Sequence, residues 1–348
     1  LFFLFVLLLL SFIYPFFISY NYIAATESLI RYITPIVVLL YSYSIRFSFN
    51  MLLKFFILYT LLSFGYQIII YLSIYYGVDN FWFFNEVRRG VYSSNTVFGI
   101  LRATGLLGFF DIYGFLNLIM FFLIHYFYIG KYKNILLIIT FLAVIFSISF
   151  KLIFCFLIFC FLIKKYRLKV LLVSSSLIII GQVYFINLSD ELISQISKRS
   201  ELYITSVNSA RAESYVVMIN ELKNLNFFGK GLATFGGPAS TKYNSPYYDE
   251  VNFDWHGLEL ATTDTYYPHL FVEIGLLPSL LYLFIILFPL FNFKLKIKKI
   301  KILLIIYFTL LFTSIFTFAL NDIIYMIFSL LLIYPIINSC DKKKYELL

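Results

Sequence analysis

The sequence predicts an all-α polytopic integral membrane protein, folded as a single membrane domain over residues 1–348. The first observation is composition: 61% of the residues are hydrophobic and 13% are charged, whereas soluble domains carry about 25% charged residues. The second is that the apolar residues gather in runs close to the roughly 20 residues that a helix needs to cross a bilayer. A water-soluble fold of this size could not cover its surface with so few charges.

The apolar runs divide the chain into about 10 predicted transmembrane helices. We expect them near residues 1–19, 28–45, 52–76, 112–130, 134–149, 152–164, 170–187, 269–292, 302–320 and 322–338. The chain begins at Leu1 and is already apolar there, which indicates a trimmed start with room for a further span upstream.

Basic residues help to decide whether residues 134–164 form a hairpin or one long helix with Lys151 in its middle. Lys131 and Lys133 precede this stretch, and a second basic group follows it at residues 164–169. A hairpin that turns at Ser147–Lys151 keeps both groups in the cytoplasm, as the positive-inside rule prefers. A single crossing would separate them and invert the side assignment of one half of the chain.

With the hairpin, the charge pattern predicts the topology. Cytoplasmic segments then hold 16 of the 27 Lys and Arg residues, but of the 18 Asp and Glu residues only Asp341 and Glu346. The 16 are Arg46, Lys54, Lys131, Lys133, Lys164, Lys165, Arg167, Lys169, Lys294, Lys296, Lys298, Lys299, Lys301, Lys342, Lys343 and Lys344. Both chain ends are therefore expected in the cytoplasm, with external loops at about 77–111 and 188–268. The net charge of +9 is a topology signal, and no nucleic-acid partner is expected.

The larger external loop contains a predicted helix. Asn208 and Ser209 are residue types that cap a helix start, and Gly229–Gly231 ends it. Between them, Tyr215, Val216, Ile219 and Leu222 form an apolar stripe at helical spacing.

Arg211 falls in the first turn of this helix, where the helix dipole disfavours a cation. A bound phosphate would explain the arginine, because the helix N-terminus and the guanidinium would converge on one anion. The alternative is a solvated arginine that pairs with Glu213 or Glu201.

The smaller external loop carries three arginines. We interpret Arg88 and Arg89 first as interfacial anchors to lipid phosphate. Arg102 precedes a stretch of small residues at 103–108, where glycines let a backbone approach a ligand closely, so it is a candidate for function. Lys151, at the predicted hairpin tip, is placed to meet lipid headgroups or a substrate phosphate.

Three candidate proton acceptors lie at the end of the larger loop. Asp264 precedes the span at 269–292, His269 is its first residue, and Glu273 lies close to membrane depth, where an ionisable group indicates function by default. The alternatives are a turn or cap role for Asp264 and an interfacial, backbone-bonded ring for His269. No His, Cys and carboxylate cluster has metal-ligand spacing, so no metal site is expected. The sequence has no Walker or dinucleotide glycine pattern, and no cofactor is expected.

Several stretches, in order over roughly residues 80–290, resemble the O-antigen polymerase and O-antigen ligase superfamily. Its long periplasmic loop is similar to Ser209-Ala210-Arg211, Tyr215 and Asn226-Phe227-Phe228-Gly229-Lys230-Gly231, followed by Asp264-Thr265-Tyr266 and Glu273-Ile274-Gly275-Leu276-Leu277. Arg102 with Gly105, Gly108 and Gly114 resembles the arginine segment of the family's other external loop, and Ser147-Ile148-Ser149-Phe150-Lys151 resembles its short turn between spans. Ligases of the family typically carry a histidine where this chain has Asp264, which favours a polymerase.

The resemblance implies a glycosyltransferase of the bacterial inner membrane, acting in lipopolysaccharide biosynthesis without a metal or a sugar nucleotide. Its donor would be a glycan on undecaprenyl diphosphate, and its acceptor a sugar hydroxyl on a second lipid-linked repeat unit. Arg102 and Arg211 would hold the diphosphate, with Arg89 and Lys151 as further candidates. Asp264 would activate the acceptor hydroxyl, with His269 or Glu273 as alternatives. Membrane lipid is a further partner, and whether a chain-length regulator binds is left open.

Two other functions stay open. An O-antigen ligase, which transfers finished glycan to a lipid A core, shares the same loop residues and differs in its acceptor. A flippase or transporter for lipid-linked sugar would usually show internal repeats and midplane ionisable residues on broken helices. Here the charges gather in external loops and no repeat is visible, so the transferase is favoured.

Overall fold

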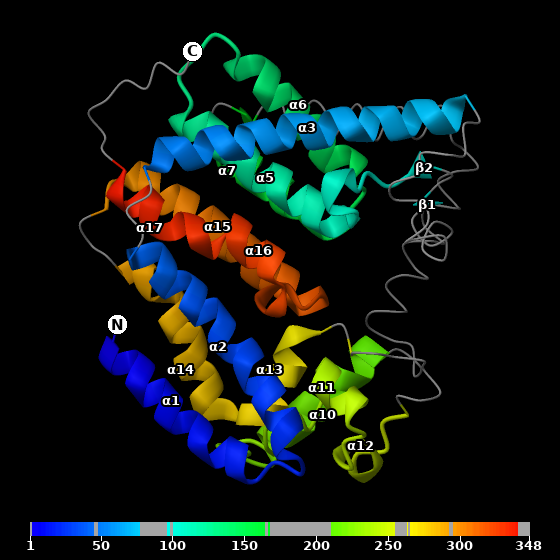
Figure 1. Cartoon of the computed structure of the whole chain (residues 1–348), viewed down its shortest axis with the longest axis vertical. Coiled ribbons are helices and arrows are strands. Elements are labelled where there is room, and N and C mark those ends of the chain that lie inside the picture. Colours follow the sequence, from blue (N-terminus) through cyan, green and yellow to red (C-terminus); the bar gives the residue numbers. More distant parts are fainter. Residues whose placement is uncertain are drawn as a thin grey trace. The chain divides into compact units, whose positions relative to one another are not determined.

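A computed structural model describes residues 2–44, 48–76, 96–97, 100–163, 166–167, 210–254, 263, 265–291 and 295–339. In these residues the predicted all-helical character is confirmed, apart from two short strands, β1 (Thr96–Val97) and β2 (Ile100–Leu101), which pair antiparallel. The α-helices, coloured in chain order in Figure 1, are α1 (Phe2–Phe17), α2 (Tyr22–Ser44), α3 (Phe49–Tyr75), α5 (Phe110–Phe127), α6 (Lys133–Phe146), α7 (Phe150–Leu162), α10 (Ala210–Lys223), α11 (Pro238–Lys242), α12 (Tyr247–Glu250), α13 (Tyr266–Ile274), α14 (Leu276–Leu287), α15 (Ile297–Phe316), α16 (Ile323–Phe328) and α17 (Leu330–Asn338). Three 3-10 turns, η2 (Gly105–Leu107), η4 (Phe288–Phe291) and η5 (Ala319–Asn321), complete the described elements.

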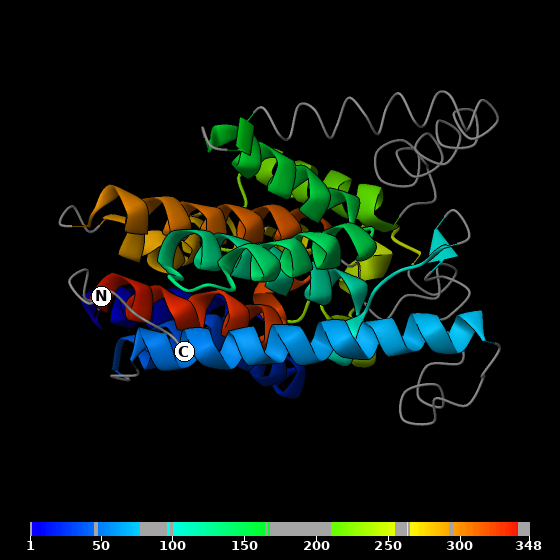
Figure 2. The same cartoon turned by 90° about the horizontal axis from the view of Figure 1, so that it is seen from above.

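Four of the described helices are long and apolar enough to cross a membrane: α2, α3, α5 and α15. Five further apolar stretches form shorter helices, at Val6–Phe17, Lys133–Phe146, Phe150–Leu162, Leu276–Phe291 and Ile323–Asn338. Figure 2 shows α3 as one uninterrupted helix. This architecture is compatible with a helical membrane protein. The count of about 10 spans stays a prediction, and the expected span at 170–187 lies outside the described residues.

The chain divides into two compact units, each described here by itself. Unit 1 comprises Leu1–Leu39, Phe161–Asn292 and Leu310–Ile323. Unit 2 comprises Leu40–Cys160, Phe293–Thr309 and Ile324–Leu348. Unit 1 therefore contains the described part of the larger loop with α13 and α14, and unit 2 contains the end of the smaller loop with α5, α6 and α7.

The hairpin predicted within residues 134–164 is confirmed. Helix α6 ends at Phe146 and α7 begins at Phe150, so the alternative of one continuous helix is wrong. Ile148 adopts a φ of 44° between them, a left-handed conformation that β-branched residues rarely occupy. The side of the membrane on which this turn lies stays a prediction.

Three expected spans differ from the helices observed. Helix α2 begins at Tyr22 rather than near residue 28, because the Asn21 side chain accepts hydrogen bonds from the backbone N–H groups of Ile23 and Ala24. The span expected at 269–292 is broken at Gly275 into α13 and α14. The span expected at 322–338 is likewise divided, between α16 and α17 at Ser329.

Candidate functional site

Two motifs of the larger loop join in unit 1. The segment Asn226–Gly231 lies along Val272–Leu277, and four backbone hydrogen bonds connect the two segments. Two run from the N–H groups after Gly275: Leu276 N to Asn226 O and Leu277 N to Phe227 O, each at 3.1 Å. Two run in the other direction: Gly231 N to Glu273 O at 3.1 Å and Lys230 N to Val272 O at 2.9 Å. Gly229 and Gly275 adopt φ values of +86° and +80° at the closest approach. The glycines are needed because a Cβ on Gly229 would lie 2.1 Å from the Glu273 carbonyl oxygen.

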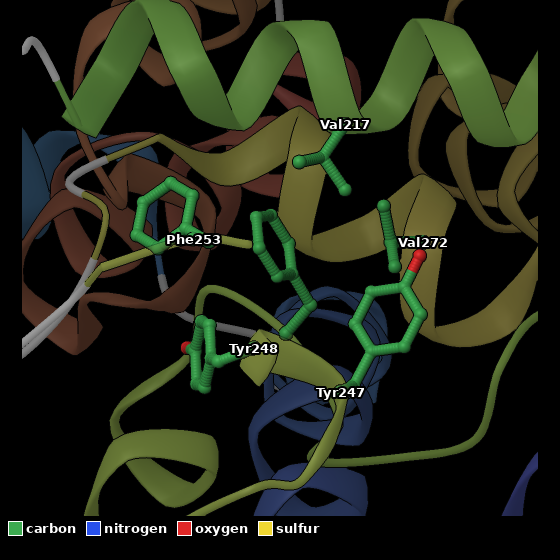
Figure 3. Packing of buried hydrophobic residues seen from close by; sticks show 6 residues of the cluster. Val217, Tyr247, Tyr248, Phe253 and Val272 are labelled. Carbon is green, nitrogen blue, oxygen red and sulfur yellow. The ribbon is translucent and has the colours of Figure 1, made fainter. Parts of the chain in front are cut away.

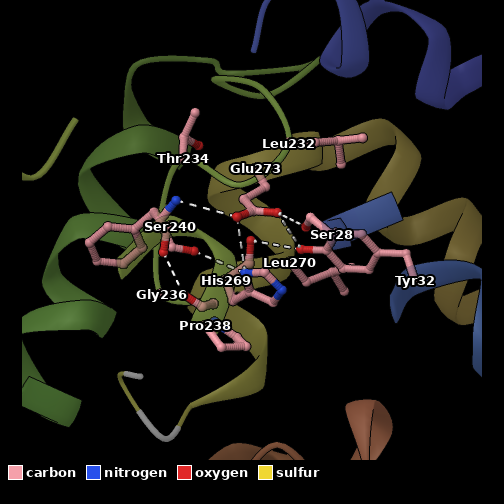
Figure 4. A network of polar contacts seen from close by, with 12 residues as sticks. Ser28, Tyr32, Leu232, Thr234, Gly236, Pro238, Ser240, His269, Leu270 and Glu273 are labelled. Atoms are coloured by element: carbon pink, nitrogen blue, oxygen red, sulfur yellow. Dashed lines mark hydrogen bonds and ion pairs between the residues drawn. The ribbon is translucent and has the colours of Figure 1, made fainter. Parts of the chain in front are cut away.

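This junction places Glu273 in a fully buried site on α13. Its Oε2 accepts hydrogen bonds from Ser28 Oγ at 2.8 Å and from the Tyr32 hydroxyl at 3.1 Å, both on α2 (Figure 4). Its Oε1 accepts the Phe235 backbone N–H at 3.3 Å. A buried carboxylate is tolerable only with such a set of donors, and this one draws them from two segments far apart in the sequence.

His269 lies one helical turn before Glu273. Its Nδ1 is 2.9 Å from the Phe235 carbonyl oxygen and 3.3 Å from Glu273 Oε1. The ring stacks on Tyr32, with centroids 5.0 Å apart and planes inclined by 16°. Only 1% of the residue is exposed. His269 and Glu273, two of the three predicted proton acceptors, are therefore in direct contact.

An aromatic cluster holds the segment that faces His269. Phe235 packs among Val217, Tyr247, Tyr248, Phe253 and Val272 (Figure 3). The Gly236 N–H donates to the Tyr248 hydroxyl at 2.9 Å, and Ser240 Oγ lies 2.7 Å from the same oxygen. Burial raises the pKa of Tyr248, so this hydroxyl stays protonated. The cluster thus fixes the Phe235 carbonyl that the imidazole contacts.

Arg211 is half-buried in the first turn of α10, as predicted. Ser214 Oγ donates to the Arg211 carbonyl at 2.7 Å and lies 2.8 Å from Thr265 Oγ1. Thr265 Oγ1 is in turn 3.2 Å from Thr263 Oγ1. The turn that carries Arg211 is therefore hydrogen-bonded to Thr265, which in turn contacts Thr263, whereas Asp264 between them lies outside the described residues.

Glu213 was one of two predicted ion-pair partners for Arg211. Burial, and then the charge of Asp254, raise the pKa of this carboxyl. The other predicted partner, Glu201, lies outside the described residues, as do Asn208 and Ser209, the expected caps of α10.

In unit 2, Arg102 is buried, with its guanidinium 4.0 Å from the centroid of the Phe110 ring. The Gln67 side-chain oxygen accepts the N–H groups of Thr104 and Gly105, each at 2.9 Å, and the Ala103 N–H donates to Phe146 O at 2.8 Å. The small-residue stretch thus seats the segment after Arg102 tightly on α3 and α6. Arg89 lies outside the described residues.

Lys151 does not protrude from the hairpin tip. Its Nζ lies 2.8 Å from Asp111 Oδ2 in a largely buried ion pair, and Ser149 Oγ donates to the other oxygen of Asp111. Because Phe110 and Asp111 are consecutive, Arg102 and Lys151 both lie at the first turn of α5. The sequence reasoning missed Asp111, although an acidic residue in a helix's first turn is a usual signal.

We expect Lys151→Met to lower the free energy of unfolding by about 3–5 kcal/mol, because it leaves the Asp111 carboxylate buried and unpaired. Thermal unfolding in detergent measures this, with the exposed Lys131→Met as control. The double variant Asp111→Asn/Lys151→Met should recover most of the loss. If Lys151→Met is as stable as the wild type, the ion pair is not structural and the predicted phosphate role of Lys151 gains support.

Other site residues were not found from the sequence. Ser28 and Tyr32 lie in an apolar helix about 240 residues before their partner, and nothing in local spacing connects them. No group of three or more His, Cys, Asp or Glu side chains placed to hold a metal ion occurs in the described part of the chain. No family model, curated protein or solved structure matches the chain.

Proposed function

We propose that this protein is a membrane glycosyltransferase that polymerises polyprenyl-diphosphate-linked oligosaccharide repeat units into O-antigen or a related surface polysaccharide. The observation that carries the proposal is the hydrogen bond between Ser214 and Thr265. It joins the turn that carries Arg211 to Thr265 at the start of α13, the helix that carries His269 and Glu273, so that a cation and two candidate proton acceptors belong to one substructure. The resemblance of both segments to the O-antigen polymerase and ligase superfamily points to the same chemistry.

The reaction needs both kinds of group. The bond from the anomeric carbon to the diphosphate oxygen breaks, and a bond from that carbon to the acceptor oxygen forms. Negative charge develops on the departing diphosphate, and a positioned arginine stabilises it electrostatically. Arginine suits this role because its planar guanidinium binds phosphate in a bidentate manner. The acceptor proton passes to a base from the segment 264–273.

The proposal includes a location. The chain would lie in the bacterial inner membrane with both ends in the cytoplasm, and the loops at about 77–111 and 188–268 would face outward. Polymerisation would then take place on the external face, where lipid-linked repeat units are presented. Apolar helices and the basic segments of the sequence support this placement.

A deletion strain of the native host tests the function. We expect lipid-linked oligosaccharide with a single repeat unit to accumulate, and purified protein to convert that extracted lipid into a polymer ladder. Long lipid-linked chains that fail only to reach lipid A would indicate a ligase instead. A normal glycan profile in the deletion strain would overturn the proposal.

A second candidate, a transporter for lipid-linked sugar, is favoured by the break between α13 and α14. Broken helices that carry buried ionisable groups are typical of transporter substrate sites, and His269 and Glu273 lie just before the break at Gly275. A transporter's deletion strain would hold the lipid-linked repeat unit on the cytoplasmic face, where an external glycosidase could not reach it. Purified protein would then form no polymer from the extracted lipid.

A further inference from the structure

The hydrogen bonds of His269 fix its tautomer. The Phe235 carbonyl oxygen can only accept, so the Nδ1 atom 2.9 Å away must carry a proton. In the neutral imidazole, Nε2 then bears the lone pair. The ring nitrogen able to take up a proton is therefore the one that points away from Glu273.

That nitrogen is buried and has no hydrogen-bond partner within the described part of the chain. Buried polar atoms are paired in the great majority of cases, so an orphaned ring nitrogen on a residue with 1% exposure needs an explanation. The ring edge lies close to the backbone of Gly237, where a Cβ would meet Cε1 at 2.6 Å, Nδ1 at 3.0 Å and Nε2 at 3.3 Å. No side chain at position 237 can cover the imidazole.

Glu273 is arranged to support a charged imidazole. Its Oε1 lies 3.3 Å from Nδ1, and its other oxygen is held by Ser28 and Tyr32, so it cannot turn away. A purely structural network would explain these bonds equally well but would not explain an unsatisfied Nε2. An acid that faces one ring nitrogen while the other is unoccupied is the arrangement of a base and its orienting group.

We infer that His269 Nε2 is the base that removes the proton from the acceptor hydroxyl, and that Glu273 is its positioning residue. The inference rests on the proposed function and assigns the base to His269 rather than to Asp264. The acceptor oxygen bonds to the anomeric carbon, its proton passes to Nε2, and the polyprenyl diphosphate departs. Glu273 stabilises the imidazolium that results.

His269→Asn tests the base. The asparagine amide can replace Nδ1–H as the donor to Phe235 O but offers nothing at Nε2. We expect a thermal transition close to that of the wild type and a loss of about 100-fold or more in polymerisation of the lipid extracted from the deletion strain. A folded His269→Asn variant that keeps more than a tenth of the activity would overturn the inference. The inference would also fail if Asp264→Asn loses activity while His269→Asn keeps it.

Glu273→Gln tests the positioning role, with the exposed Glu250→Gln as matched control. We expect kcat to fall by about 100-fold or more while KM for the extracted lipid stays the same. The reason is that the attraction between the Glu273 carboxylate and a positive charge on the ring exists only after the imidazole has taken up the proton. Unchanged kcat, or a change confined to KM, would overturn the role of Glu273 even if His269→Asn proves unstable. If the wild-type protein forms no polymer, it is the proposed function that fails.

Discussion

Arg211→Ala should shorten the surface polymer to single repeat units and reduce polymerisation of the extracted lipid by about 100- to 1000-fold. The guanidinium is expected to stabilise charge that exists only as the diphosphate departs, so the loss should fall on kcat. The hydrogen bond from Ser214 Oγ reaches the backbone carbonyl of residue 211, so Arg211→Ala keeps this contact. Polymer length on gels and turnover by the purified protein measure the effect.

Lys223→Ala, at the exposed end of the same helix, is the matched control and should behave like the wild type. Arg211→Lys should rescue poorly, since an ammonium cannot form a bidentate bond to phosphate. Arg102→Ala is the corresponding test in unit 2. Wild-type polymer length in cells that carry either alanine variant would contradict the role assigned to that arginine.

Gly229→Ala should lower the free energy of unfolding by about 3 kcal/mol or more, from a backbone clash together with the left-handed φ. The added Cβ would meet the Glu273 carbonyl oxygen at 2.1 Å and the Ile274 carbonyl carbon at 2.6 Å. Both are backbone atoms and cannot rotate away. The junction with α13 would therefore have to separate.

Gly65→Ala is the control, because a Cβ there meets nothing within 4 Å in the middle of α3. It should leave the protein equally stable or slightly more stable, by about 0.5–1 kcal/mol. Thermal unfolding of the purified proteins in detergent compares the two. Equal transitions for both variants would show that the close approach at Gly229 is not required.

Local patterns predicted much of the fold. The hairpin at residue 147 follows from the charge pattern, and α10 (Ala210–Lys223) lies where the spacing of apolar residues and the glycines at 229–231 predict a helix. The break at Gly275 does not follow from such local patterns, because residues on both sides are apolar and the distortion depends on a segment 46 residues earlier that supplies Gly229.

The face that α10 buries was also misjudged. The predicted stripe included Val216 and Ile219, which are 55% and 45% exposed, while Ser214, Val217 and Glu221 are buried. Polar residues lie inward here because specific partners exist: Thr265 for Ser214, and the Tyr247 hydroxyl for Glu221. Hydrophobic periodicity carries no information about such partners.

The same limit applies to the candidate site. Sequence reasoning named His269 and Glu273 as separate alternatives to Asp264, and the structure joins them through a carbonyl at Phe235 and hydroxyls on α2. Backbone groups have no sequence signature. A catalytic base whose orientation depends on a backbone carbonyl can therefore be identified only from the folded structure.

The seating of residues 103–105 on Gln67 and Phe146 has a consequence for the position of Arg102. The segment that directly follows Arg102 is bonded to helices α3 and α6, and the Gln67 side-chain oxygen alone accepts two of its backbone N–H groups. The substitution Gln67→Leu would leave both groups without this acceptor. The placement of the guanidinium therefore depends on a side chain 35 residues earlier in the sequence, which never touches a substrate itself.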